Sequence, residues 1–387
     1  MQEVFKKGGL IKIGLFSDAY LPEISGVTSV VSWLKRELER LDHEVYVYVP
    51  AYEGVKEKEE RVYRFRSHRF VFHKTSRVAL PYNRKATRTF KHLDIIHSHT
   101  PFSLGLVALG AAIRYRIPHV HTYHTHLTAY RHYLPLPLRP PKKTTEELAA
   151  AFCNRCNVIT APSNPIKEEL ESYGVYRPIH VLPFGVDQEL FRKPPVWNPR
   201  ESLEIGKDAH LYLYAGRLAV EKNLAFLLRA YKRIHTEDPN SVLVIAGDGP
   251  RRRALEEIAE QEDIKAAVRF AGFLDHPRLV DLYKQADIFL FSSKTETEGL
   301  VLVEAMAGGT PPIAIGELGV LDVVEDGISG ILVPEDEEVF AKATLSLIND
   351  PTRYRELQEG ALKRAEELSV QNATRKLLRI FEEYVNK

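Results

Sequence analysis

The sequence predicts an α/β protein with two Rossmann-like domains, each built on a doubly wound parallel sheet, which face each other across an interdomain cleft. Short β-rich runs alternate with amphipathic helical patterns along nearly the whole chain, and such alternation is typical of parallel sheets. The alternation fails around residues 183–201, where prolines accumulate. A length of 387 residues is also comfortable for two domains.

The first domain is expected to span residues 1–185. Helical patterns lie between its strand-like runs, and the third begins with Pro165 at its first position and ends before Gly174. The expected strands are 10–16, 44–49, 94–99, 119–123, 158–161 and 179–182, and the expected helices are 27–41, 102–115 and 165–173.

The second domain is expected to span residues 186–368, beyond a linker at 183–201. Its strands are predicted at 210–215, 242–246, 268–271 and 288–292, with helices at 223–235, 250–260 and 277–285. Two further helices, 351–368 and 370–385, close the chain. We expect the C-terminal segment 369–387 to pack back on the first domain.

Composition indicates a soluble globular protein, with 44% apolar and 27% charged residues. No apolar run approaches the roughly 18 residues that span a bilayer, and the first apolar run is more typical of a strand than of a signal peptide. Only Cys153 and Cys156 are present, so we expect no disulfide framework and a cytoplasmic location. Their CxxC spacing fits a redox pair or half a zinc site, but packing is the favoured interpretation.

The two halves of the chain carry opposite charge. Residues 1–186 hold 27 Lys and Arg against 17 Asp and Glu, or +10, and the remainder holds 26 against 35, or −9. The stretch 61–92 contains ten Lys and Arg and no acid. Such a run is usually a solvated face. If it binds a partner, an anionic membrane surface is at least as good a candidate as nucleic acid. Because no nucleic-acid module accompanies it, we expect no nucleic-acid partner.

The stretch KTETEGLVLVEAMAGGTP, residues 294–311, places two carboxylates around a helix start. Glu296 precedes Gly299, where a helix is expected to begin, and Glu304 lies inside the apolar run that follows. Free amides at a helix start bind phosphate oxygens, whereas carboxylates suit the hydroxyls of a sugar and a ribose. The plainer alternative is an exposed loop acid and a solvent-facing helix acid.

Other strand ends carry groups that suit a diphosphate. Arg217 follows one strand directly, and Lys222 precedes the next helix, so that the two cations could clamp it. Gly247 lies in a tight GDGP turn, where the lack of a side chain permits a ligand to approach the backbone closely. The alternative is that this segment is only a turn. Gly26 opens the first long helix, which offers a second anion cradle.

Histidines concentrate in the first half, which holds twelve of the fifteen. They end two strands, in HSHT at 97–100 and HTYHTH at 121–126. A metal site is the alternative here, but no acid lies within either motif to complete a hydrolase-type set. We favour a single histidine near a transferred group, and no metal.

Taken together, these motifs resemble the retaining glycosyltransferases of the GT-B fold, in the large group-4 family. Its Glu-x7-Glu signature matches Glu296 and Glu304, followed by EAMAGGTP. The resemblance covers nearly the whole chain, through PEISGVTSVV at 22–31, YHT at 123–125, PFGVD at 183–187, GRLAVEKN at 216–223, AGDGP at 246–250 and AGF at 271–273.

The resemblance implies a role for each matching residue. Arg217 and Lys222 would hold the nucleotide diphosphate, and Glu304 would accept from the ribose hydroxyls. Glu296 and the amides of Leu300 and Val301, after Gly299, would hold the donor sugar and its phosphate. The remaining matches are the backbone around Phe273 for the base, His124 for the sugar, and Gly26 and Gly247 for close approach of the donor.

Two positions depart from the family pattern. The first loop has Ser25-Gly26 where paired glycines are usual, and Glu298 stands where many members carry an aromatic residue. Neither change removes a reactive group, but because of both changes the resemblance does not determine which sugar donor is used.

The implied reaction transfers a hexose, expected to be glucose from a UDP-linked donor, with retention. No DxD-type carboxylate pair is placed for magnesium, so we expect no metal or other cofactor. The segment 129–143 interleaves aromatic, leucine and basic residues, which suits a membrane interface or a proline-stiffened surface loop.

Together with HTYHT, this segment resembles diacylglycerol glucosyltransferases. We therefore expect a lipid acceptor and peripheral attachment to the inner face of the cell membrane. A soluble acceptor such as a sugar, a glycerate or a polyol is the alternative. A sugar-nucleotide epimerase and a non-catalytic nucleotide or nucleic-acid binder remain open as other classes.

Overall fold

The computed structural model describes residues 9–23, 25–55, 59–69, 77–124, 139–296 and 299–386. The chain divides into two compact units. The first unit comprises residues 1–184 and 370–387, and the second comprises residues 185–369. The chain therefore leaves the first unit once and returns to it for its last helix.

The first unit is built on a seven-stranded parallel sheet in the order β3-β2-β1-β6-β7-β8-β9. Its strands are β1 (Lys12–Phe16), β2 (Glu44–Pro50), β3 (Val62–Phe65), β6 (Ile95–Ser98), β7 (His119–Thr122), β8 (Val158–Ala161) and β9 (Ile179–Val181). A short antiparallel pair, β4 (Ser67–Arg69) and β5 (Arg77–Ala79), stands apart from this sheet.

In the described part of this unit, five helices connect the strands, and a sixth arrives from the end of the chain. Ser25 caps the first by accepting a hydrogen bond from the Thr28 amide, and Asn83 caps the second in the same way. The helices are α1 (Gly26–Arg40), α2 (Arg84–Phe90), α3 (Ser103–Tyr115), α4 (Lys142–Cys153), α5 (Asn164–Ser172) and α15 (Val370–Val385).

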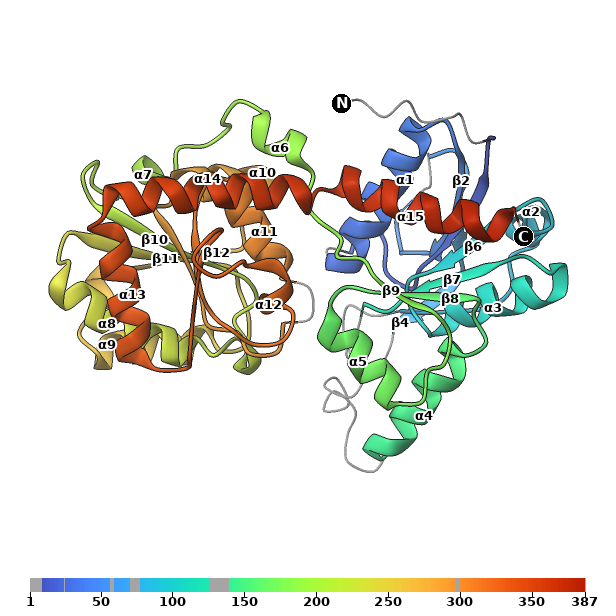
Figure 1. Cartoon of the computed structure of the whole chain (residues 1–387), viewed down its shortest axis with the longest axis horizontal. Coiled ribbons are helices and arrows are strands. Elements are labelled where there is room, and N and C mark those ends of the chain that lie inside the picture. The colour runs from blue at the N-terminus through green and yellow to red at the C-terminus, as the bar shows by residue number, and fades with distance from the viewer. Residues whose placement is uncertain are drawn as a thin grey trace. The chain divides into compact units, whose positions relative to one another are not determined.

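The last helix, α15, completes one face of the first unit. Figure 1 shows it in red beside α1, in blue. Leu377 and Phe381 are fully buried in a core that α15 shares with α1 and the central strands. The apolar positions of α15 therefore face the sheet of a unit whose other elements lie far earlier in the sequence.

The second unit is built on a six-stranded parallel sheet in the order β12-β11-β10-β13-β14-β15. Its strands are β10 (His210–Ala215), β11 (Ser241–Ala246), β12 (Val268–Gly272), β13 (Ile288–Phe291), β14 (Pro312–Ile315) and β15 (Ile331–Val333). Its helices are α6 (Gln188–Arg192), α7 (Pro199–Ser202), α8 (Leu224–Glu237), α9 (Arg252–Gln261), α10 (His276–Gln285), α11 (Leu300–Ala307), α12 (Val320–Val323), α13 (Glu337–Ile348) and α14 (Pro351–Glu367).

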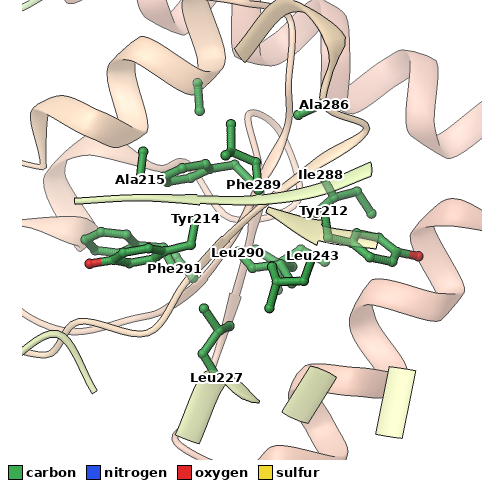
Figure 2. Packing of buried hydrophobic residues seen from close by; sticks show 14 of the residues in the cluster. Tyr212, Tyr214, Ala215, Leu227, Leu243, Ala286, Ile288, Phe289, Leu290 and Phe291 are labelled. Carbon is green, nitrogen blue, oxygen red and sulfur yellow. The ribbon is translucent and has the colours of Figure 1, made fainter. Parts of the chain in front are cut away.

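Aromatic side chains fill the centre of the second unit. Tyr212 and Tyr214 of β10 and Phe289 and Phe291 of β13 are among the largest fully buried residues. Figure 2 shows them with Leu227 of α8 and other apolar side chains of the same core. Strands buried on both faces carry continuous apolar runs, as these two do.

The strand order reverses once in each sheet, between β1 and β6 in the first unit and between β10 and β13 in the second. In doubly wound sheets, ligands bind beyond the carboxyl ends of the strands at such a reversal. Each unit therefore has one position in its sheet where a ligand site is expected.

These sheets confirm the predicted pair of Rossmann-like domains. The interpretation of 183–201 as a linker is wrong for most of its length, because the second unit begins at residue 185 and this stretch holds α6 and α7. Asp281 fixes the stretch by accepting hydrogen bonds from the amides of Val196 and Trp197, at 2.8 and 2.9 Å. Among the described residues, no helix is both long and apolar enough to cross a membrane.

Replacing Phe381 with Ala should destabilise the first unit by about 3–5 kcal/mol, because it leaves a cavity in a closed core. Urea unfolding followed by circular dichroism would measure the loss. The exposed Lys376 of the same helix provides the control, and Lys376→Ala should change the free energy of unfolding little. Equal effects of the two substitutions would contradict the packing of α15 described above.

Candidate functional site

Two loops meet at the carboxyl ends of β10 and β13. The Ser292 hydroxyl donates to the backbone carbonyl of Lys222 at 2.8 Å, and the Ser293 hydroxyl donates to that of Glu221 at 3.4 Å. Both serines are buried. The loop after β10 is thus fastened to the end of β13, although about seventy residues separate them along the chain.

Each of the two predicted cations is paired with an acid. The Lys222 Nζ lies 2.6 Å from the Glu296 Oε2, and both side chains are about four-fifths shielded from solvent. Arg217 forms an ion pair with Glu221, one helical turn along the same loop. The structure therefore brings Lys222 and Glu296 into direct contact.

The amino end of α11 opens beside this pair. Gly299 takes a left-handed conformation, with φ of 66°, and none of the described side chains caps the helix. The amides of Leu300 and Val301 belong to the first turn, whose donors have no acceptor within the helix. Donors of this kind, next to Lys222, suit a phosphate group.

Glu304 is buried inside α11. Its Oε1 lies 3.1 Å from the His276 Nε2, and its Oε2 accepts a hydrogen bond from the Tyr283 hydroxyl at 3.0 Å. The alternative of a solvent-facing helix acid is wrong, because only 8% of Glu304 is exposed. The hydrogen bond to Glu304 raises the pKa of His276. Neither His276 nor Tyr283 was singled out from the sequence.

The predicted glycines lie where two turns touch. Gly247, with φ of 136°, sits so close to Gly216 that a Cβ atom would lie 1.9 Å from the Gly216 carbonyl oxygen. A side chain at 247 is therefore excluded by the neighbouring turn, whatever it does toward a ligand. Phe273 follows β12 and is 66% exposed.

Tyr214 is a buried residue of this site that was not predicted from the sequence. Its hydroxyl is buried and has no hydrogen-bond partner among the described residues. Burial raises the pKa of Tyr214, and the nearby carboxylates of Glu296 and Glu221 raise it further. A Cβ atom at Gly216 would lie 2.7 Å from this hydroxyl, which explains a glycine there. Tyr214 lies within an apolar β-strand pattern, so the sequence does not indicate that its hydroxyl belongs to the site.

In the first unit, the reversal between β1 and β6 is occupied by a carboxylate of the chain itself. Asp18 accepts hydrogen bonds from the Thr100 hydroxyl at 2.7 Å and the Leu104 amide at 3.0 Å, and a further one from Ser103. Burial raises the pKa of Asp18. Asp18 therefore fills the amino end of α3, whereas Gly26 begins α1, which Ser25 caps.

The histidines at the ends of β6 and β7 form a buried cluster. His124 Nε2 lies 3.0 Å from His99 Nδ1, and His97 contacts the Thr122 hydroxyl at 2.6 Å. Burial lowers the pKa of His124 to about 3, and it lowers that of His119 to about 3 as well. These imidazoles are thus neutral near pH 7. Within the described ranges, no group of three or more His, Cys, Asp or Glu is arranged to hold a metal ion.

The two cysteines are buried in the core beneath β7 and β8, where packing was expected. Burial raises the pKa of Cys153 to about 12, and the pKa of Cys156 is raised for the same reason. Such thiols carry no thiolate near neutral pH, so they are unreactive.

The predicted residues fall into two groups. Arg217, Lys222, Glu296, Gly299, Leu300, Val301, Glu304, Gly247 and Phe273 belong to the second unit, at the carboxyl ends of β10 to β13, and Gly26 and His124 belong to the first. Some of the sequence lies outside the described residues: Thr125 of the YHT motif, Glu298, and parts of the two stretches assigned to membrane contact, namely 70–76 and 129–138.

Comparison with known proteins shows where this arrangement occurs. A family model for "Glycosyl transferases group 1" matches residues 196–364, and one for "Glycosyltransferase Family 4" matches residues 24–190. An alpha-monoglucosyldiacylglycerol synthase of Streptococcus pneumoniae is 32% identical over 349 residues, which cover 88% of this chain and 79% of that protein. The chain belongs to glycosyltransferase family 4.

A further relative and a solved structure also match this glycosyltransferase over most of its length. An alpha-monoglucosyldiacylglycerol synthase of Acholeplasma laidlawii is 32% identical over 85% of this chain and 86% of its own length. The crystal structure of Anabaena Alr3699/HepE in complex with UDP aligns with a TM-score of 0.77 at 20% identity and covers 96% of this chain and 100% of that one. The likeness confirms the predicted GT-B fold.

Replacing Glu304 with Gln should lower the pKa of His276, because the hydrogen bond to the carboxylate is the largest cause of its raised value. The titration of the His276 ring resonances, followed by NMR, measures this pKa directly. His43 of the first unit, whose pKa is lowered by burial, serves as an internal reference, and its pKa should not change. An unchanged His276 titration in the variant would show that Glu304 does not hold this ring.

Acid should weaken the first unit before its carboxylates titrate. The folded pKa of His119 and His124 lies below their ordinary 6.5, so the unfolded chain binds protons that the folded chain does not. The free energy of unfolding should therefore be unaffected above the ordinary value and should fall from about pH 6.5 toward about pH 5. Urea unfolding across this range measures the slope, which His119→Gln should reduce. A flat profile would contradict neutral burial of the cluster.

Proposed function

We propose that this glycosyltransferase moves glucose from UDP-glucose to a lipid acceptor such as diacylglycerol, with retention, to form an α-glycosidic bond. One observation carries the proposal: two cations, the start of helix α11 and a buried carboxylate lie at the strand reversal of the second unit. The two relatives named as alpha-monoglucosyldiacylglycerol synthases support the choice of sugar and acceptor.

In this proposal the second unit binds the donor. Arg217, Lys222 and the first amides of α11 take the diphosphate, because cations and free amides are its natural partners. Glu304 accepts from the ribose hydroxyls and Glu296 from the sugar hydroxyls. The exposed Phe273 marks the edge where the base would lie.

Donor binding exchanges existing contacts for new ones. The Lys222 Nζ now neutralises Glu296, at 2.6 Å. A diphosphate that draws Lys222 away would free the Glu296 carboxylate, which then accepts hydrogen bonds from the sugar. The same exchange applies to Arg217 and its partner Glu221. When one ligand breaks an ion pair, its phosphate thus binds the cation and its hydroxyls bind the carboxylate.

The reaction breaks the bond between the anomeric carbon and the phosphate oxygen of the donor, and it forms a bond from that carbon to the acceptor oxygen. The acceptor proton passes to the departing phosphate oxygen, and the products are the glycoside and UDP. Arg217, Lys222 and the α11 amides stabilise the charge that develops on the diphosphate, without a metal ion. The expected contact of His124 with the sugar and that of Gly26 with the diphosphate remain predictions.

We assign acceptor binding to the first unit, whose sequence carries the basic stretch 61–92 and the segment 129–143. Lys and Arg near a membrane surface are attracted to anionic lipids. The proposed enzyme would therefore work at the inner face of the cell membrane as a peripheral protein.

Thermal shift with UDP, GDP, ADP and their common hexose conjugates, each with and without EDTA, tests the donor. Saturation at about 100 times the dissociation constant adds about 2.7 kcal/mol of stability. UDP and UDP-glucose should raise Tm equally with and without EDTA. A shift only with another nucleotide would change the donor, and a shift abolished by EDTA would contradict metal independence.

Product analysis tests the acceptor. Incubation of UDP-glucose with diacylglycerol in vesicles should yield an α-glucosyl lipid, and parallel reactions with sugars, glycerate and polyols should not. Transfer to a soluble acceptor alone would overturn the lipid assignment. Conversion of the donor sugar with no acceptor present would identify an epimerase instead.

Replacing Arg217 or Lys222 with Ala should lower turnover by more than about tenfold, because each removes a charge opposite the developing diphosphate. Turnover would be measured at saturating UDP-glucose. Lys342→Ala is the matched control, since Lys342 forms a surface ion pair with Glu338 elsewhere in the second unit. Near-normal turnover in both site variants would contradict the assignment of the diphosphate site.

A further inference from the structure

A surface groove of about 490 Å³ runs between α2 and α3 in the first unit. Nearly all of its lining is apolar or small. The lining residues are Ala79, Pro81, Thr87, Phe90, Ser103, Leu106, Val107, Gly110, Ala111, Arg114 and Tyr115. The groove contains none of the predicted donor residues, of which Arg217, Lys222, Glu296 and Glu304 belong to the second unit.

The groove begins at the edge of the sheet where the acceptor is expected. Ser103, at the start of α3, donates to Asp18 just beyond the carboxyl end of β1 and accepts from the Ala79 amide at 2.9 Å. Tyr115 ends α3 at the opposite edge. Twelve residue steps at 1.5 Å each make the groove about 18 Å long. One leaflet of a bilayer, half of a core of about 30 Å, is about 15 Å deep.

Apolar side chains remain exposed along the groove. Leu106 is 59% exposed, and Leu80 and Phe102 beside it are 43% and 54% exposed. Apolar residues gathered in this way on a soluble protein mark a surface that another molecule covers. No residue of α2 or α3 is acidic, whereas Arg84, Lys85, Arg88, Arg114 and Arg116 on or next to them are all exposed.

Gly110 lines the groove without a steric reason for a glycine. A Cβ atom at Gly110 would meet nothing within 4 Å, although a glycine in a helix interior costs up to about 1 kcal/mol relative to Ala. Gly105, in the same helix, differs, because its Cβ atom would lie 1.9 Å from the Thr100 carbonyl oxygen. Gly105 is thus required by packing, and Gly110 leaves open space.

We propose that the α2–α3 groove binds one acyl chain of an anionic membrane phospholipid, with Gly110 in its lining and the exposed arginines of α2 and α3, which form its basic rim, paired with the lipid phosphate. The apolar lining fits the chain, and the acid-free basic rim fits the headgroup. This extends the proposed function, on which it rests for the presence of a lipid substrate at the membrane. Figure 1 shows α3, which forms one wall.

The test uses the full chain and a water-soluble lipid, dioctanoyl phosphatidylglycerol below its micelle concentration, with binding measured by calorimetry. Gly110→Leu fills the groove, and it should not destabilise α3, because Leu has a better helix propensity than Gly. Affinity should fall at least about tenfold, the effect of displacing roughly two methylene groups. Gly110→Ala should bind nearly as tightly as the natural protein.

Two ligand controls separate the chain from the headgroup. Glycerophosphoglycerol, which has no acyl chain, should not bind measurably, and dioctanoyl phosphatidylcholine should bind more weakly because its headgroup is zwitterionic. Arg88→Ala should reduce this preference for the anionic lipid. Leu148→Asp, an exposed apolar residue of α4 outside the groove, should leave affinity unchanged.

The outcomes that contradict the proposal are distinct. Equal or tighter binding by Gly110→Leu would indicate a flat apolar surface, since added apolar area would then help. An absence of binding by the natural protein would overturn the site outright. A dimer in sedimentation that Gly110→Leu dissociates would assign the groove to a second copy of the chain. Because this assay needs neither donor nor turnover, failure of the transferase assignment would appear only in the nucleotide and product assays.

Discussion

The pairing of β10 with β13 is the constraint on which the proposed donor site depends. Tyr212 lies opposite Ile288 and Leu213 opposite Phe289, so the strands end at one edge and their loops have to meet. Slippage by one residue would turn buried aromatic side chains toward the wrong face, so the core fixes the register. The serine hydrogen bonds from the end of β13 then hold the loop that carries Lys222. The polar contacts between the two loops therefore depend on the apolar packing of the two strands.

The same site is electrically balanced without a ligand. Lys222 is paired with Glu296, Arg217 with Glu221, and Glu304 with both His276 and Tyr283. Such contacts keep a set of charges and buried polar groups stable in a folded chain. They also mean that a ligand gains only the difference between its own contacts and those it replaces. A donor with both a diphosphate and hydroxyl groups can replace both halves of each pair.

Sequence pattern predicted the elements with strong periodicity or capping signals, such as the helix capped at Ser25 and the long helices that close the chain. It missed β14, a short apolar run two residues beyond a glycine pair, and the short helices in the proline-rich stretch 183–201, because neither is long enough to show a period. The charged residues of the proposed donor site could be selected from the sequence because they stand at strand ends. Tyr214 and His276 could not, since their roles come from contacts across the fold and not from spacing.

The return of the chain to its first unit has a consequence for biosynthesis. Residues 41–369 separate α1 from α15, yet the two helices share one core. Chains fold as they leave the ribosome, so the second unit has all of its residues available while the first still lacks a helix. The apolar face that α15 later covers is exposed during this interval. The nascent first unit is therefore the part of the molecule that a chaperone would protect, and the synthesis of α15 ends that need.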